Sequence, residues 1–251
     1  MNKIGSYKKE LLHLSPKNWE EFLMKYSGLP GQRGNLELAR AFAETATLMD
    51  FKKYVRLDPE EAPENTPEVF LVFCGVLGFG EYLAHYHDGG LLRQLRKRAN
   101  DPRWRVREAV AMALQTIGRK NSKRLLKYAR SWIEGSLLEQ RAVIAGFCEP
   151  DILRDVEVKD HVFEFLDWAT ASMIAFDDKK DDAYEVLRKG LSYCWSVAAA
   201  EMPEKGKGKI ERWIKEKHPV VNRIMRENLK KQRLRKVDPI WVDNMLDKLT
   251  A

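Results

Sequence analysis

Apolar residues recur along most of the chain at the spacing of an α-helix. Trp19, Phe22, Leu23 and Tyr26 follow one another at intervals of three, one and three residues, which places them on one helix face. Sustained alternation of apolar and polar residues, the mark of a half-buried strand, is nearly absent. The pattern therefore predicts an all-α fold.

Breaks in this pattern divide the first part of the chain. Residues 28–35 (GLPGQRGN) read as a loop, and helical spacing returns over 36–49. Residues 58–67 hold three prolines and four acids, which suit neither helix nor strand. The apolar run Val69–Gly80 follows at once, so we expect a loop inside one domain; at 12 residues the run is shorter than the roughly 20 of a membrane helix and predicts a buried helix.

A repeated unit emerges from about residue 67 onward. Asp101–Leu114 and Leu138–Phe147 align with Arg107 on Arg141, an offset of 34 residues, and His218–Leu229 is a weaker copy. Helical units at such a period are typical of an α-solenoid, here of about 12 helices. We expect a helical cap over residues 1–66 and a repeat solenoid over 67–251, in one continuous domain.

The repeat itself resembles a known pattern. Asp101-Pro102, Val106-Arg107, Ala109 and Leu114 stand where HEAT repeats place such residues. Proline opens the helix, and the small apolar residues pack on the neighbouring unit. The resemblance implies an armadillo-type superhelix of HEAT-like repeats.

Charge is unevenly distributed along the chain. The net charge is +7 overall, +10 over residues 91–141 and +7 over 202–251, against −7 over 142–201. Two basic blocks predict a surface that binds a polyanion such as duplex DNA, if the fold brings them to one side. A solvated set of helix faces, or a surface for an acidic protein partner, explains the same charges.

The basic candidates for phosphate contact follow one another near the first clear repeat. They are Arg103, Arg107, Lys120, Arg124 and Lys127, with 120, 123, 124 and 127 expected in one helical register.

Three segments are similar to the AlkD-like DNA alkylation repair glycosylases, a HEAT-like family. Trp104 to Glu108 resembles the segment in which that family sets a tryptophan and an Asp four residues apart on one helix. The segment around Arg141 resembles one with an arginine in the DNA cleft, and Lys189–Trp195 resembles a late helix with a second tryptophan. The resemblance implies DNA binding, with Trp104, Glu108 and Trp195 as catalytic candidates and Arg141 on the nucleic acid.

The implied chemistry is hydrolysis of the N-glycosidic bond of a cationic alkylated purine. A Trp face attracts such a cation, and a carboxylate stabilises the charge that develops on the sugar. Glu108 is one methylene longer than the family's Asp, which is enough to displace the carboxylate by more than about 1 Å relative to the family's arrangement.

Each of these residues also has a structural explanation. Trp104 suits an aromatic plug at the start of a repeat helix, and Trp195 suits a packed core. Glu108 suits a pair with Arg105, Arg107 or a neighbouring helix, and Arg141 stands where HEAT repeats often have a structural arginine. A non-catalytic HEAT-repeat scaffold for protein–protein interaction is therefore the alternative function.

No cofactor or metal is expected. His85 and His87 are two residues apart and point to different sides of a helix, so they do not share a metal site easily. The three cysteines are far apart with no CxxC pair, which favours a reducing, cytoplasmic setting. The start of the chain lacks a signal-peptide pattern, and we expect a monomer that does not enter a membrane.

Overall fold

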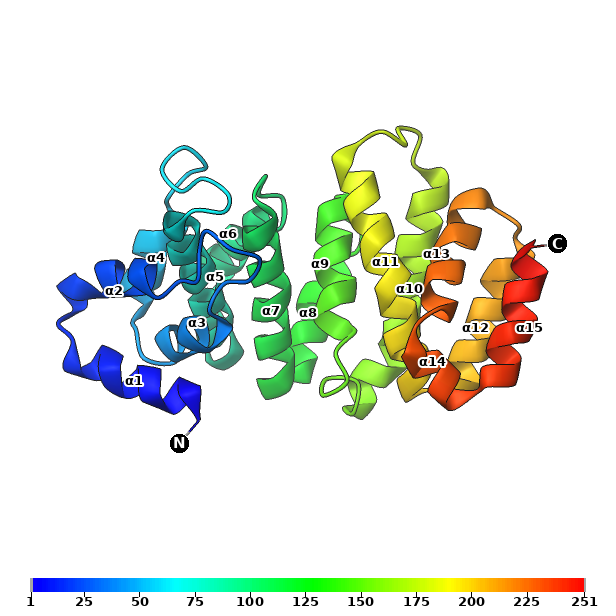
Figure 1. The fold of residues 1–251 in the computed structure, drawn as a ribbon, viewed down its shortest axis with the longest axis horizontal. Helices are drawn as coiled ribbons and strands as arrows, with labels where there is room; N and C mark the ends of the chain where they lie inside the picture. The colour runs from blue at the N-terminus through cyan, green and yellow to red at the C-terminus, as the bar shows by residue number, and fades with distance from the viewer. Residues whose placement is uncertain (1, 251) are drawn as a thin grey trace. The chain divides into compact units, whose positions relative to one another are not determined.

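The computed structural model describes residues 2–250, and over this range the chain is entirely helical, without strands. Figure 1 shows the helices in chain order. The first half holds α1 (Lys3–His13), the 3-10 helix η1 (Pro16–Asn18), α2 (Trp19–Lys25), α3 (Leu36–Ala43), α4 (Leu48–Val55), α5 (Pro67–His85), α6 (Gly89–Ala99) and α7 (Trp104–Lys120). The second half holds α8 (Ser122–Trp132), α9 (Leu137–Phe147), α10 (Val156–Ala175), α11 (Asp182–Glu201), α12 (Pro203–Lys215), α13 (Pro219–Leu229), α14 (Gln232–Val237) and α15 (Pro239–Thr250). The all-α expectation is confirmed, with fifteen α-helices between residues 2 and 250 rather than about twelve.

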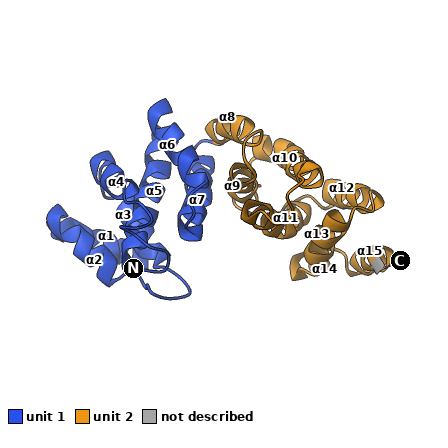
Figure 2. Cartoon of the chain, turned by 90° about the horizontal axis from the view of Figure 1, so that it is seen from above, with its two compact units in different colours: residues 1–121 blue, residues 122–251 orange. Residues whose placement is uncertain are grey.

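The chain forms two compact units, residues 1–121 and residues 122–251 (Figure 2). In the first unit α5 packs on α2, α3 and α4 as well as on α6 and α7. The N-terminal helices and the first clear repeat therefore share one core, and the division expected at residue 66 does not coincide with a boundary between units.

Helix α5 is the centre of the first unit. Its residues from Val69 to Gly80 are all buried, as the apolar run predicts. The helix is long and apolar enough to cross a membrane by length and composition, but 78% of its most apolar 18-residue stretch is buried inside the protein. Gly80 lets α5 approach α7 closely, because a Cβ there would lie 2.5 Å from the Cα of Ala113.

The helical pattern over 36–49 is divided between two helices. α3 ends at Ala43 and α4 begins at Leu48, with a turn between them. Thr47 is the N-cap of α4 and forms a capping box with Asp50. The backbone N–H of Thr47 donates to Asp50 Oδ2 at 2.9 Å, and the Thr47 hydroxyl donates to the same oxygen at 2.7 Å. Polar capping residues inside an otherwise continuous apolar pattern thus end one helix and start the next.

The second unit is built in two layers (Figure 2). Helices α9, α11 and α13 form one layer, in which α11 packs on both α9 and α13. Helices α10 and α12 belong to the second layer, where α10 packs on α9 and α11 and α12 packs on α11 and α13. Asn228 ties α13 to α11 in the core: its Oδ1 accepts from Ser196 N at 2.8 Å and its Nδ2 donates to Leu191 O at 2.9 Å. A buried amide with both ends satisfied fixes the register between these helices.

Candidate functional site

A small pocket in the first unit contains two of the predicted site residues. Its volume is about 130 Å³, and it lies between the 29–36 segment, α5 and the start of α7. Trp104, Glu108 and Met112 stand at intervals of four on α7, so all three side chains reach the pocket from one helix face. The remaining lining residues are Leu29, Gln32, Arg33, Gly34, Leu36, Phe70, Phe73 and Arg105.

Trp104 is the exposed wall of this pocket. It is the first residue of α7 and 48% of its surface is accessible. The Arg105 guanidinium lies 4.4 Å from the Trp104 ring centroid. Phe70 and Phe73 form the apolar floor, and their stacked rings lie 6.2 Å apart between centroids. The site is therefore an aromatic pocket with one carboxylate, Glu108, on its rim.

Arg105 holds the loops around the pocket in place. Its Nη2 donates to Gly31 O at 2.6 Å and to Asn65 Oδ1 at 2.9 Å, and its Nε lies 3.1 Å from Glu64 Oε1. One arginine thus joins the loop before α3 and the loop before α5 to the start of α7. Because Glu64 neutralises it, Arg105 adds little net charge to the pocket.

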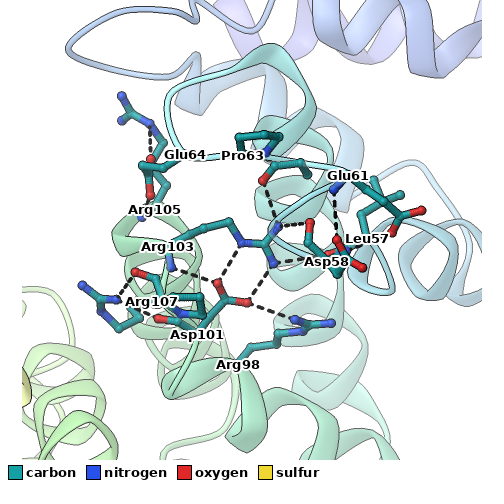
Figure 3. A network of polar contacts seen from close by, with 12 residues as sticks. Leu57, Asp58, Glu61, Pro63, Glu64, Arg98, Asp101, Arg103, Arg105 and Arg107 are labelled. Carbon is teal, nitrogen blue, oxygen red and sulfur yellow. Dashed lines mark hydrogen bonds and ion pairs between the residues drawn. The ribbon is translucent and has the colours of Figure 1, made fainter.

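Arg103, predicted to contact nucleic acid, is instead buried beneath this region, with 3% of its surface exposed. Figure 3 shows its guanidinium between Asp101 and the 57–62 loop. Both Nε and Nη2 donate to the Asp101 carboxylate at 2.8 Å, and Nη1 donates to the carbonyls of Asp58 and Ala62 at 3.0 Å. These donors are used inside the unit, so the side chain is not presented to a phosphate.

Two further predicted phosphate ligands also have partners within the first unit. Arg107 donates through Nη1 to the carbonyls of Asp101 and Pro102 at 2.7 Å, which caps the turn before α7. Lys120 forms an ion pair with Glu81. Helix α7 ends at Lys120 and α8 begins at Ser122, so the expected single register through 120, 123, 124 and 127 is interrupted. Arg124 and Lys127 lie on α8 in the second unit, partly exposed and exposed respectively.

Trp195 is fully buried, with 0% of its surface accessible. Its Nε1 donates to Thr170 Oγ1 at 3.1 Å, and its ring centroid lies 5.9 Å from that of Phe163. The ring therefore has no open face on which a base could stack. Trp195 is therefore a core residue, as its structural explanation predicts.

The exposed aromatic on the same helix is Tyr193, which no motif in the sequence marks as a site residue. Leu187, Leu191, Trp195 and Ala198 are spaced as one apolar stripe and are buried. Tyr193 falls outside this stripe and is 46% exposed. Helical register within α11 is the signal that separates the two aromatic residues.

Arg141 lies on α9 against α11. A Cβ at Gly190 would lie 3.4 Å from Arg141 Cγ, so the aliphatic part of the arginine packs on the α11 backbone one turn before Tyr193. Arg141 belongs to the second unit, whereas Trp104 and Glu108 belong to the first.

Among residues 2–250 no group of three or more His, Cys, Asp or Glu side chains is placed to hold a metal. Cys74, Cys148 and Cys194 are free and buried. Burial raises the pKa of the Cys74 and Cys148 thiols well above the usual value, which keeps them in the weakly nucleophilic protonated form.

Comparison with known proteins adds no relative. No model of a known protein family matches the chain, and neither a curated protein nor a solved structure does. The functional argument therefore depends on the geometry described above.

Proposed function

We propose that this chain binds DNA and holds a single extruded cationic base, such as an alkylated purine, in the Trp104–Glu108 pocket. The observation that carries the proposal is that both side chains line one pocket within one unit. A half-exposed indole beside a carboxylate is the combination that attracts a flat, positively charged ring. An extruded base needs such a pocket, because a base inside a duplex presents neither face.

The chemistry of the pocket suits recognition first and hydrolysis second. Cation–π contact with Trp104 contributes about 0.5–2 kcal/mol, and the apolar floor excludes water from the base. In hydrolysis the C1′–N bond would break, the base would leave as a neutral molecule with the bonding electrons, and water would add to C1′ and release one proton to solvent. The Glu108 carboxylate would stabilise the positive charge on the sugar.

The same proposal includes the architecture and the setting. HEAT-like repeats are supported by the layered order of the second unit, in which α11 packs on α9 and α13 while α10 and α12 lie behind them. Three free, buried cysteines suit a reducing, cytoplasmic location. We propose that the chain acts as a monomer.

The test is selective binding by the full chain. Fluorescence anisotropy would compare a duplex carrying one cationic alkylpurine with the same duplex carrying the unmodified purine. The proposal predicts a preference for the alkylated duplex of roughly 2- to 30-fold, which is the cation–π energy expressed as an affinity ratio. Trp104→Ala and Glu108→Gln should each reduce this preference toward one.

Matched controls exist on the second unit. Trp168 on α10 is 49% exposed, nearly the same exposed fraction as the 48% of Trp104. Glu164 lies one helical turn before Trp168. Trp168→Ala and Glu164→Gln should keep the preference. Equal affinity of the wild-type chain for both duplexes would overturn the proposal, and release of free base over time would assign the hydrolytic step to the pocket.

A protein-binding scaffold is favoured by one observation. Trp168 and Glu164 border two surface hollows of about 430 and 410 Å³ in the second unit. An exposed tryptophan beside hollows is typical of a protein interface. A chain that serves only as such a scaffold would not bind duplex DNA at low ionic strength.

A further inference from the structure

Two cations surround the exposed Tyr193 ring in the second unit. The Arg233 guanidinium lies 4.4 Å from the ring centroid, and its Nη2 donates to the Tyr193 hydroxyl at 2.8 Å. The Lys231 ammonium lies 6.0 Å from the same centroid. Tyr193 comes from α11, Lys231 directly precedes α14 and Arg233 lies within it, so the tertiary packing of these two helices creates the group.

The charges of this group are not compensated by the protein. Neighbouring arginines have acidic partners: Arg235 pairs with Asp243 at 2.7 Å and Arg223 pairs with Glu227 at 3.5 Å. Within residues 2–250, by contrast, no carboxylate lies within ion-pair distance of Lys231 or Arg233. Lys231 and Arg233 are partly exposed, and the exposed Lys230 before them adds a third positive charge to the segment.

The guanidinium is held in a defined orientation. The Tyr193 ring supports its face and the Tyr193 hydroxyl accepts from one nitrogen, whereas the remaining N–H donors have no acceptor among the described residues. Bidentate recognition of an oxyanion needs such a fixed fork of donors. Fixing it before the ligand arrives lowers the entropy lost on binding.

We propose that Tyr193, Lys231 and Arg233 form a phosphate-binding cluster for the backbone of a nucleic acid. The inference rests on the proposed function and adds to it a contact in the second unit, apart from the Trp104–Glu108 pocket of the first unit. A nucleic acid is favoured over a membrane surface because aromatic side chains interleaved with cations are a recurrent phosphate-and-base platform.

The experiment measures binding of the full chain to an unmodified duplex across a series of salt concentrations. The variant Lys231→Gln/Arg233→Gln should lower the slope of log K against log salt by about 1–2, since two phosphate contacts are lost. Arg235→Gln is the matched control. It removes one positive charge from the helix that carries Arg233, but from a side chain that already has a carboxylate partner, and it should change the slope by less than half as much.

Two conservative variants separate positioning from charge. Tyr193→Phe keeps the ring and removes the hydroxyl that orients Arg233, so affinity should fall while the slope stays the same. Arg233→Lys keeps the charge and loses the fork, with the same expected result. Both substitutions are on the surface, so circular dichroism should report an unchanged fold.

The outcomes are distinguishable. If the wild-type chain does not bind the duplex, the proposed function fails. If it binds and the double variant keeps the wild-type slope, or loses no more than Arg235→Gln, this inference is overturned while the proposed function stands. Cluster-dependent binding to phosphatidylserine vesicles with no effect on the duplex would also overturn it.

Discussion

Asp101 and Arg103 form a bidentate ion pair in the interior of the first unit. Nε and Nη2 of the arginine each lie 2.8 Å from a different oxygen of the carboxylate. Arg98 donates to the same carboxylate at 2.9 Å, and Arg103 reaches on to the 57–62 loop (Figure 3). The pair therefore joins the turn between α6 and α7 to the loop before α5, next to the pocket.

Loss of this pair should destabilise the protein strongly. Arg103→Gln leaves a buried carboxylate with fewer donors and strands the loop carbonyls, at a cost of about 3–5 kcal/mol in the free energy of unfolding. Urea denaturation measures it. Arg154→Gln is the control, because its pair with Asp151 is exposed and should contribute about 1 kcal/mol or less. A loss below that of the control would contradict the assigned role.

The contribution of Asp101 should depend on pH. Burial alone would raise the pKa of Asp101, but the hydrogen bonds and the charge of Arg103, with the Arg98 hydrogen bond, hold it below its usual value. Since the folded-state pKa is depressed, the stabilisation is present above the unfolded-state pKa of about 3.9 and is lost as pH falls through the folded-state pKa. The stability difference between wild type and Asp101→Asn should be constant near neutral pH and shrink in acid. A difference that grows in acid would refute this.

Close packing of α5 on α7 gives a third prediction. Gly80→Ala places a methyl group 2.5 Å from the Ala113 Cα, so the helices must separate, at a cost of about 1–3 kcal/mol. Gly208→Ala is the opposite case: nothing lies within 4 Å of the added atom in α12, and the better helix former should stabilise by up to about 1 kcal/mol. Thermal unfolding of the two variants should shift in opposite directions.

The buried amide of Asn228 gives a prediction for the second unit. Asn228→Ala leaves Ser196 N and Leu191 O without their partners, and each unsatisfied group costs about 1–3 kcal/mol. Asn244→Ala, at an exposed position of α15, is the control and should change stability little. Hydrogen exchange should report faster opening of α11 and α13 in Asn228→Ala alone.

Local pattern predicted the helices better than it predicted the roles of charged residues. The spacing of Trp104 and Glu108 on one helix placed both side chains in one pocket. The same reasoning could not reveal that Arg103 turns inward, because its partners in the 57–62 loop are more than 40 residues away along the chain. The family resemblance points to Trp195, whereas the apolar stripe of α11 places Trp195 inward and Tyr193 outward.

The cluster of Tyr193, Lys231 and Arg233 also depends on contacts that local sequence pattern cannot predict. Lys231 and Arg233 stand out as part of a basic run, but only the packing of α14 on α11 brings them to an aromatic ring 40 residues earlier. Likewise, the acidic partner Asp243 neutralises Arg235 of the same run, whereas Lys231 and Arg233 have no such partner among the described residues. Tertiary pairing, rather than the number of basic residues, determines where a polyanion can bind.

Binding of the wild-type chain to duplex DNA, measured by anisotropy between about 50 and 200 mM salt, tests the nucleic-acid assignment most directly. The account predicts measurable binding at the lower concentration and an affinity that falls at least tenfold, roughly linearly in log–log form, toward the higher one. No binding at low salt, or an affinity that does not change with salt, would contradict it.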